Sequence, residues 1–162
     1  MCIEDKISKF MIKISKFEFF MINENIELAH IQHKDGLQKL AGVRWEKLAA
    51  LIEQKHRFSV FDFKSSGFVF FKETSPQYLV KDNGSLKWDS DEVTIDSWSK
   101  LLTRSFAQLR NNIAHGNKAH ILAPFTRQRT EEFIDAGNAL VDFIAKDIFS
   151  QADWEMPIEF QN

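Results

Sequence analysis

Two residue types suited to phosphodiester chemistry lie five positions apart at Arg110 and His115, and Asn111 directly follows the arginine. The planar guanidinium of an arginine offers paired donors to phosphate oxygens. A histidine, with an ordinary pKa of about 6.5, can give or take a proton around neutral pH. This combination indicates a site in which one group stabilises negative charge on a phosphate and the other transfers a proton.

A helix over about residues 94–117 is expected to carry this pair. Thr94 or Asp96 can cap its N-terminus, and Gly116 can end it. At about 100° per residue, the apolar face expected to meet the core consists of Trp98, Leu102, Phe106, Leu109 and Ile113. The opposite, polar stripe consists of Arg104, Gln108, Asn111 and His115.

The helical spacing also limits how the pair can work. Arg110 lies at the border between the core side and solvent, so its stem can pack on apolar neighbours while its head reaches a phosphate. Residues five apart on a continuous helix point about 140° away from each other. Arg110 and His115 therefore converge only if the helix unwinds at Gly116 or if a second subunit supplies the other half.

Length and composition predict one folded domain, residues 1–162. With 44% apolar and 27% charged residues, 162 residues can bury a sizeable core. The net charge of −2 provides no global basic field, so nucleic-acid binding would need a local patch. The single cysteine, Cys2, and the lack of a long apolar N-terminal run favour a cytoplasmic protein with no membrane association.

Apolar residues recur at helical spacing in three further segments. They predict a first helix over about 7–31, a second over about 37–55 and a fourth over about 127–149. Most of the sixteen Phe and four Trp are expected in the core. The first helix is apolar beyond one stripe, which favours a second face for a partner; the residues that widen it are Met11, Phe20, Ile22 and Ile26.

A small β insertion is predicted over about 57–92, between the second and third helices. The Phe-rich residues 58–71 favour strands, although an extension of the helix is the open alternative. Asn83-Gly84 accepts the positive φ angles of a type I′ turn, so residues 78–88 predict a hairpin. The expected fold class is mainly α, a four-helix array with a small β-hairpin insertion between helices two and three.

The motif resembles that of the HEPN (higher eukaryotes and prokaryotes nucleotide-binding) superfamily. Its signature is an Arg, four to six residues and a His, commonly with a polar residue directly after the Arg; Arg110, Asn111 and His115 match it in place and order, followed by Gly116. The upstream hairpin looks like that of plasmid-type single-domain members. The resemblance implies a HEPN-like four-helix bundle, often a homodimer with two motifs facing one cleft, and metal-independent RNA cleavage.

The resulting hypothesis is an endoribonuclease with RNA as its substrate. The biological role that this suggests is that of the toxin in a toxin–antitoxin or phage-defence system, with an antitoxin protein as a further partner. A base withdraws the 2′-OH proton and the oxygen attacks phosphorus, with His115 as proton-transfer group, Arg110 stabilising charge and Asn111 orienting either the imidazole or the phosphate. Neither a cofactor nor a metal is required. Lys118, Arg104 and Arg127 are weaker candidates for guiding the RNA backbone.

Two alternatives stay open at the level of sequence. In the first, Asn111 and His115 cap the helix and Arg110 pairs with a carboxylate on a neighbouring helix, which is a purely structural role. In the second, the chain is a catalytically silent HEPN module that binds an antitoxin, a nucleotide or another protein through the first helix. His30 and His33 lack the further ligands of a recognised metal-site spacing and are expected to be packed or solvent-facing.

Overall fold

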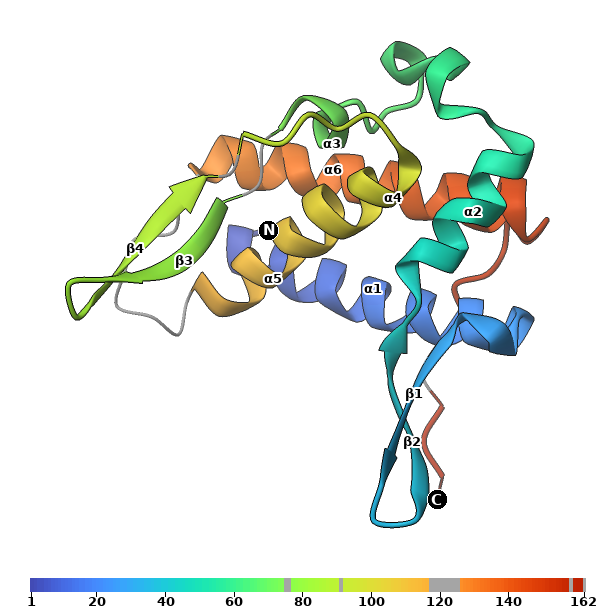
Figure 1. Ribbon diagram of the computed structural model, residues 1–162. Coiled ribbons are helices and arrows are strands. Elements are labelled where there is room, and N and C mark those ends of the chain that lie inside the picture. The colour runs from blue at the N-terminus through green and yellow to red at the C-terminus, as the bar shows by residue number, and fades with distance from the viewer. Residues whose placement is uncertain (75–76, 91, 117–125, 158, 162) are drawn as a thin grey trace.

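The protein is mainly helical and carries two small antiparallel hairpins, β1–β2 and β3–β4 (Figure 1). The computed structural model describes residues 1–74, 77–90, 92–116, 126–157 and 159–161. Within that part of the chain the helices gather in one body, from which the hairpins project in different directions (Figure 1).

The helices differ in length, and the one with the motif is made of three consecutive segments. α1 spans Ile3–Glu24, α2 spans Trp45–Lys55, α3 spans Phe70–Glu73 and α6 spans Arg127–Phe143, the last continuing as a π-helical segment Ile144–Ile148. The helix with the motif consists of α4 (Trp98–Lys100), a π-helical segment Leu101–Phe106 and α5 (Ala107–Gly116), which follow one another without a gap.

The N-cap of this helix lies one residue after the predicted Asp96 and three after the predicted Thr94. Ser97 is the N-cap, and its hydroxyl accepts a hydrogen bond from the backbone N–H of Lys100 at 3.1 Å. A Ser side chain at this place satisfies one of the N–H groups that the first turn leaves unpaired. The predicted apolar face of the helix is confirmed, because Trp98, Leu102, Phe106, Leu109 and Ile113 are all buried.

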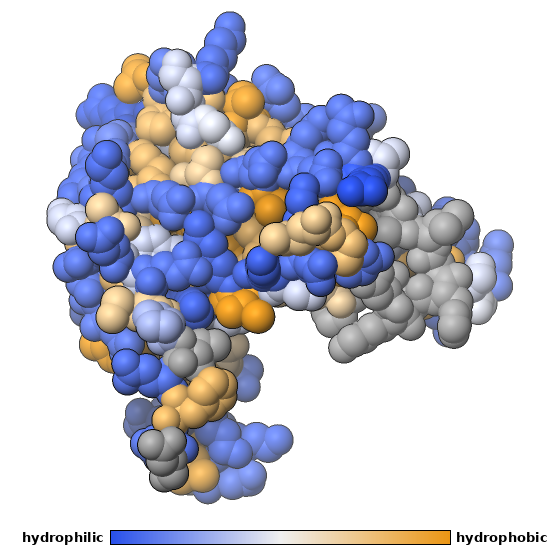
Figure 2. All heavy atoms as spheres, turned by 180° about the vertical axis from the view of Figure 1, so that it is seen from behind, coloured by the Kyte–Doolittle hydropathy of each residue, from blue (hydrophilic) through white to orange (hydrophobic). Residues whose placement is uncertain are grey.

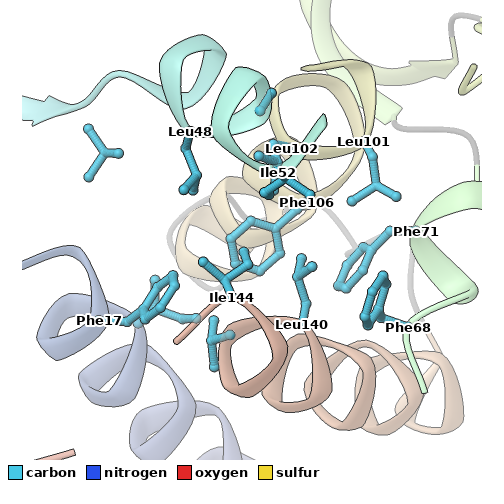
Figure 3. Packing of buried hydrophobic residues seen from close by; sticks show 14 of the residues in the cluster. Phe17, Leu48, Ile52, Phe68, Phe71, Leu101, Leu102, Phe106, Leu140 and Ile144 are labelled. Carbon is cyan, nitrogen blue, oxygen red and sulfur yellow. The ribbon is translucent and has the colours of Figure 1, made fainter. Parts of the chain in front are cut away.

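Apolar side chains from α1, α2, α6 and the motif helix meet in one core. Figure 3 shows Phe17, Leu48, Ile52, Phe106 and Leu140 pointing toward one another from these elements. α6 packs against both α1 and α3, and α2 packs against α4. Each helix thus turns its apolar face to a shared centre, which fixes its rotation about its own axis.

The expectation of strands in the Phe-rich residues 58–71 is wrong. They form 3₁₀ turns at Phe58–Val60 and Phe63–Ser65 and then the short helix α3. Their rings pack around Trp98, with Phe61 and Phe63 at centroid distances of 5.0 and 5.4 Å. The Trp98 indole N–H donates to the backbone oxygen of His56 at 2.7 Å. Burial of aromatic rings therefore outweighed their preference for strands.

The predicted bounds of the first two helices are also wrong, because a hairpin lies between them. Residues Ala29–Lys34 form β1 and Leu37–Val43 form β2, so α1 ends at Glu24 and α2 begins only at Trp45. Asp35 and Gly36, at φ of 53° and 75°, reverse the chain with the positive angles of a type I′ turn. The apolar residues Leu37 and Leu40, expected on a helix face, are largely exposed on β2.

The second hairpin and the last helix confirm their predictions. β3 (Gln77–Asp82) pairs with β4 (Ser85–Ser90), and Asn83 and Gly84 make the tight turn with φ of 48° and 82°. α6 and its π-helical continuation cover 127–148, close to the predicted 127–149, and the Thr126 hydroxyl accepts from the backbone N–H of Arg129.

The close contact between α1 and α6 yields a prediction about stability. A Cβ at Gly137 would lie 2.4 Å from Cζ of Phe10. The Phe10 ring cannot easily move away because it is buried and packs edge-on against Phe133 at 5.3 Å. Gly137→Ala is expected to lower the free energy of unfolding by about 1–3 kcal/mol, measured by urea denaturation, even though alanine is the better helix former.

Asp135→Ala, at an exposed position in the same helix, provides the control and should change stability by no more than about 0.5 kcal/mol. The double variant Phe10→Leu/Gly137→Ala should lose less stability than the sum of the single changes, because the smaller side chain relieves the clash. A Gly137→Ala variant as stable as wild type would contradict the tight contact.

Candidate functional site

Arg110 of α5 forms an ion pair with Glu18 of α1. Its Nη1 donates to Oε1 of Glu18, and both side chains are only about a quarter exposed or less. The two residues are far apart in the sequence, so the fold creates the pair by placing α1 beside α5. The contact that a structural role for Arg110 would require, a carboxylate on a neighbouring helix, is thus present.

Burial dominates the electrostatics of this pair. The pKa of Glu18 lies above its ordinary value because the carboxylate has lost much of its solvation, and the positive charge of Arg110 offsets part of this effect. Glu18 therefore holds the guanidinium in place through an interaction that is shielded from solvent. A guanidinium fixed in this way loses little conformational freedom when it meets a further anion.

Asn111 is exposed and lies next to the guanidinium. Nη2 of Arg110 approaches Oδ1 of Asn111 at 3.4 Å, at the long end of hydrogen-bond distances. The structure therefore brings two of the three predicted motif residues together, with Arg110 between a buried carboxylate and an exposed amide. The described residues supply no further hydrogen-bond partner for the guanidinium fork, whose remaining donors suit a ligand that approaches from the Asn111 side.

His115 belongs to α5, whose backbone is helical through Gly116. The helix thus does not unwind before Gly116, and positions 110 and 115 stand about 140° apart around its axis. The side chain of His115 lies outside the described part of the structure, and so does Lys118. The helical backbone alone therefore does not bring the two positions together within one chain.

The two other basic candidates lie apart from Arg110. Arg104 is exposed in the π-helical segment of the motif helix. Arg127, at the start of α6, is exposed and pairs with Glu131 one turn further along at 3.6 Å. Among the described residues neither arginine shares a hydrogen bond or ion pair with Arg110 or Glu18, so these contacts do not support either residue as a guide for RNA.

Asn112 is a structural residue that the motif did not reveal. It is buried, its Nδ2 donates to the backbone oxygen of Gln77 at 2.7 Å, and its Oδ1 accepts from Nε2 of Gln108 at 2.8 Å. The bond to Gln77 attaches β3 to α5 directly beside Arg110 and Asn111, and the bond from Gln108 orients the Asn112 amide within α5. One sequence signal could have indicated this anchor. Asn112 is a polar residue next to the apolar face of the helix, where burial is expected and a buried amide needs hydrogen-bond partners.

The outer face of α1 borders a groove of about 710 Å³, whose other wall is the chain near Trp154 and Met156. Phe19, which the sequence pattern did not single out, is 61% exposed there, and Met11 and Phe20 line it too. Of the residues expected to widen this surface, Ile22 is buried in the core instead, and Ile26 lies beyond the end of α1. Figure 2 shows hydrophobic residues interrupting the hydrophilic surface on the side opposite to Figure 1.

Other kinds of site find little support in the described part of the chain. His30 and His33 are exposed on β1, and no three His, Cys, Asp or Glu side chains of the described residues are grouped as metal ligands would be. None of the described helices is long and apolar enough to cross a membrane.

Comparison with models of protein families, with curated proteins and with solved structures finds no match to this chain. The resemblance to the HEPN superfamily therefore depends on the motif residues and their place in the helix alone.

The buried carboxylate of Glu18 predicts a pH dependence of stability. Its pKa is higher in the folded protein than the ordinary value of 4.5, so folding favours its protonated form. Its stabilising contribution is complete below that ordinary value and is lost as the pH rises through the raised value. The stability of wild type relative to Glu18→Gln should therefore fall as the pH rises above the ordinary value of 4.5, as measured by urea denaturation.

Glu24→Gln, an exposed change at the end of the same helix, serves as the control and should show a much smaller dependence. Parallel stability curves for wild type and Glu18→Gln across this range would contradict the assigned effect of burial.

Proposed function

We propose that this chain is a metal-independent endoribonuclease of HEPN type, built on a HEPN-like four-helix bundle to which the hairpins are added. The observation that carries the proposal is the placement of the motif. Arg110 is fixed by Glu18 beside the exposed Asn111, on a helix whose backbone continues to His115. Among the described residues, the motif lies at the end of the third of the four longest helical stretches, which are α1, α2, the motif helix and α6.

The proposed reaction is a transesterification. A base removes the 2′-OH proton, the oxygen attacks phosphorus, the bond to the 5′ oxygen breaks, and a proton is transferred to this leaving group. The products are a 2′,3′-cyclic phosphate and a 5′-OH. His115 transfers a proton, Arg110 stabilises the charge on the phosphoryl oxygens, and Asn111 orients the phosphate. Lys118, Arg104 and Arg127 would contact the RNA backbone further away.

The proposed site is shared between two copies of the chain in a homodimer. One copy supplies Arg110 and the other supplies His115, because the two positions diverge on a helix that is continuous through Gly116. In a two-fold dimer the same arrangement occurs twice, once on each side of the axis. The proposed setting is the cytoplasm, as the toxin of a toxin–antitoxin or phage-defence system.

A second candidate function is a catalytically silent HEPN module that binds an antitoxin, a nucleotide or another protein. Two observations favour it: the exposed Phe19 and the groove on the outer face of α1, and the pairing of Arg110 with Glu18, which is compatible with a structural role. This function requires no contribution from His115 to RNA cleavage, so the assay below separates the two candidates.

Purified protein is expected to cleave single-stranded RNA in the presence of EDTA and to leave cyclic phosphate ends. His115→Ala should lower the rate about 10²- to 10⁴-fold, which is the usual contribution of a general acid or base. His33→Ala, an exposed histidine on β1, is the matched control and should retain the wild-type rate. No cleavage by wild type, or equal cleavage by His115→Ala, excludes the enzyme and favours the binding module.

A mixture of two inactive variants tests the shared site. In a dimer formed from Arg110→Ala and His115→Ala chains, one of the two sites would hold both intact residues. After unfolding and refolding together in equal amounts, the mixture should recover about a quarter of wild-type activity, because half the dimers are mixed. Each variant refolded alone is the control. A mixture as inactive as its components would show that the site lies within one chain.

A further inference from the structure

A cavity of about 320 Å³ lies between the β3–β4 hairpin and α5, directly beside the motif. Its size is at the lower end of the roughly 300–1,000 Å³ range of small-ligand pockets. The described residues that line it are Tyr78, Leu79 and Trp88 of the hairpin and Gln108, Asn111 and Asn112 of α5. Asn111 belongs to both the cavity and the motif, since its Oδ1 is approached by Arg110.

The chemistry of the lining indicates a neutral, flat and polar-edged ligand. The described lining residues include no charged side chain, which disfavours a phosphate inside the cavity. The aromatic ring of Trp88 suits stacking, and the amides suit hydrogen bonds to the edge of a base. The guanidinium of Arg110 lies outside the cavity, next to Asn111. This separation matches a nucleotide whose base is inside and whose phosphate is at Arg110.

The hydrogen bonds already made in the cavity show which groups a ligand could use. Nε2 of Gln108 donates to Asn112, whose amide is also bonded to Gln77. That network orients Oε1 of Gln108 as an acceptor. Asn111, three residues further along the same helix face, can add its Nδ2 as a donor. One acceptor and one donor side by side complement the edge of a nucleobase, which carries a donor next to an acceptor.

Tyr78 adds a second observation in the same place. Its hydroxyl is buried and has no hydrogen-bond partner among the described residues. A buried hydroxyl without a partner is unfavourable, and a ligand or a water molecule in the neighbouring cavity can supply one. The cavity thus combines an aromatic ring, an amide pair and a lining residue, Tyr78, for whose buried hydroxyl the described residues supply no partner.

We propose that this cavity binds one unstacked base of the RNA next to the scissile phosphate and thereby gives the cleavage its base preference. The inference rests on the proposed ribonuclease function and adds specificity-determining residues to it: Gln108 reads the base edge and Trp88 stacks on its face. The hairpin is then a part of the substrate site, attached to the catalytic helix through Asn112.

Binding of nucleoside 5′-monophosphates tests the cavity independently of cleavage. Wild-type protein is titrated by calorimetry with the adenine, guanine, cytosine and uracil nucleotides, and with ribose 5-phosphate as the probe without a base. At least one nucleotide should bind about five- to hundred-fold tighter than ribose 5-phosphate, which is the range given by stacking of one base. His115→Ala should keep this preference while losing RNA cleavage.

Two variants test the residues. Gln108→Met removes the amide and keeps the side-chain length, whereas Trp88→Leu removes the aromatic ring and leaves the bond from Gln108 to Asn112 intact. Each should reduce the preference over ribose 5-phosphate at least three-fold and flatten the base preference of RNA cleavage at one position next to the cut. Gln128→Met, at an exposed position on α6, is the matched control, and circular dichroism checks that all variants are folded.

The possible failures are distinguishable. Equal binding of ribose 5-phosphate and all four nucleotides, or a wild-type preference in both folded variants, overturns the base pocket; His115-dependent cleavage of RNA by the same preparation then leaves the ribonuclease function intact. Base binding by a protein that cleaves no RNA overturns the role in cleavage specificity together with the proposed function.

Discussion

The burial of one face of the motif helix is the constraint on which the site depends. Phe106 packs edge-on against Trp45 of α2 and Phe71 of α3, at 5.8 and 5.4 Å, so two other elements hold the helix in place. With this face held in the core, the rotation of the helix is set, and so is the direction of every other residue on it. Arg110 meets α1, Asn111 faces solvent and Asn112 meets the hairpin as consequences of that one orientation.

The elements that could be predicted from the sequence are those whose signal is local. The core face of the motif helix follows from its apolar period, and the β3–β4 turn follows from Asn83-Gly84. Asp35-Gly36 carries the same kind of turn signal, but the apolar residues on either side also fit a helical period, and this misled the assignment of 29–43. The π-helical segment changes the local period as well, so that Leu101 and Ser105 are buried beside the predicted face.

The partners in the candidate site could not be predicted, because they come from distant parts of the chain. Glu18 is one of several acidic residues on α1, and only the packing of α1 against the rest of the body selects it for Arg110. Likewise, the cavity beside Asn111 exists because Asn112 bonds a backbone oxygen of β3. Periodicity identifies the face of a helix that is buried, but it does not identify which other element covers that face.

The β1–β2 hairpin constrains its own sequence less than the rest of the fold does. From His30 to Ala41 its residues are exposed on both faces, and only Ala29 and Val43 at its base are buried. Substitutions at such exposed positions usually change the stability of a protein by less than about 0.5 kcal/mol. Apart from the turn at Asp35-Gly36, the sequence of this hairpin can therefore diverge in evolution with little cost to folding. Any selection on these exposed residues then acts through the molecules that they contact.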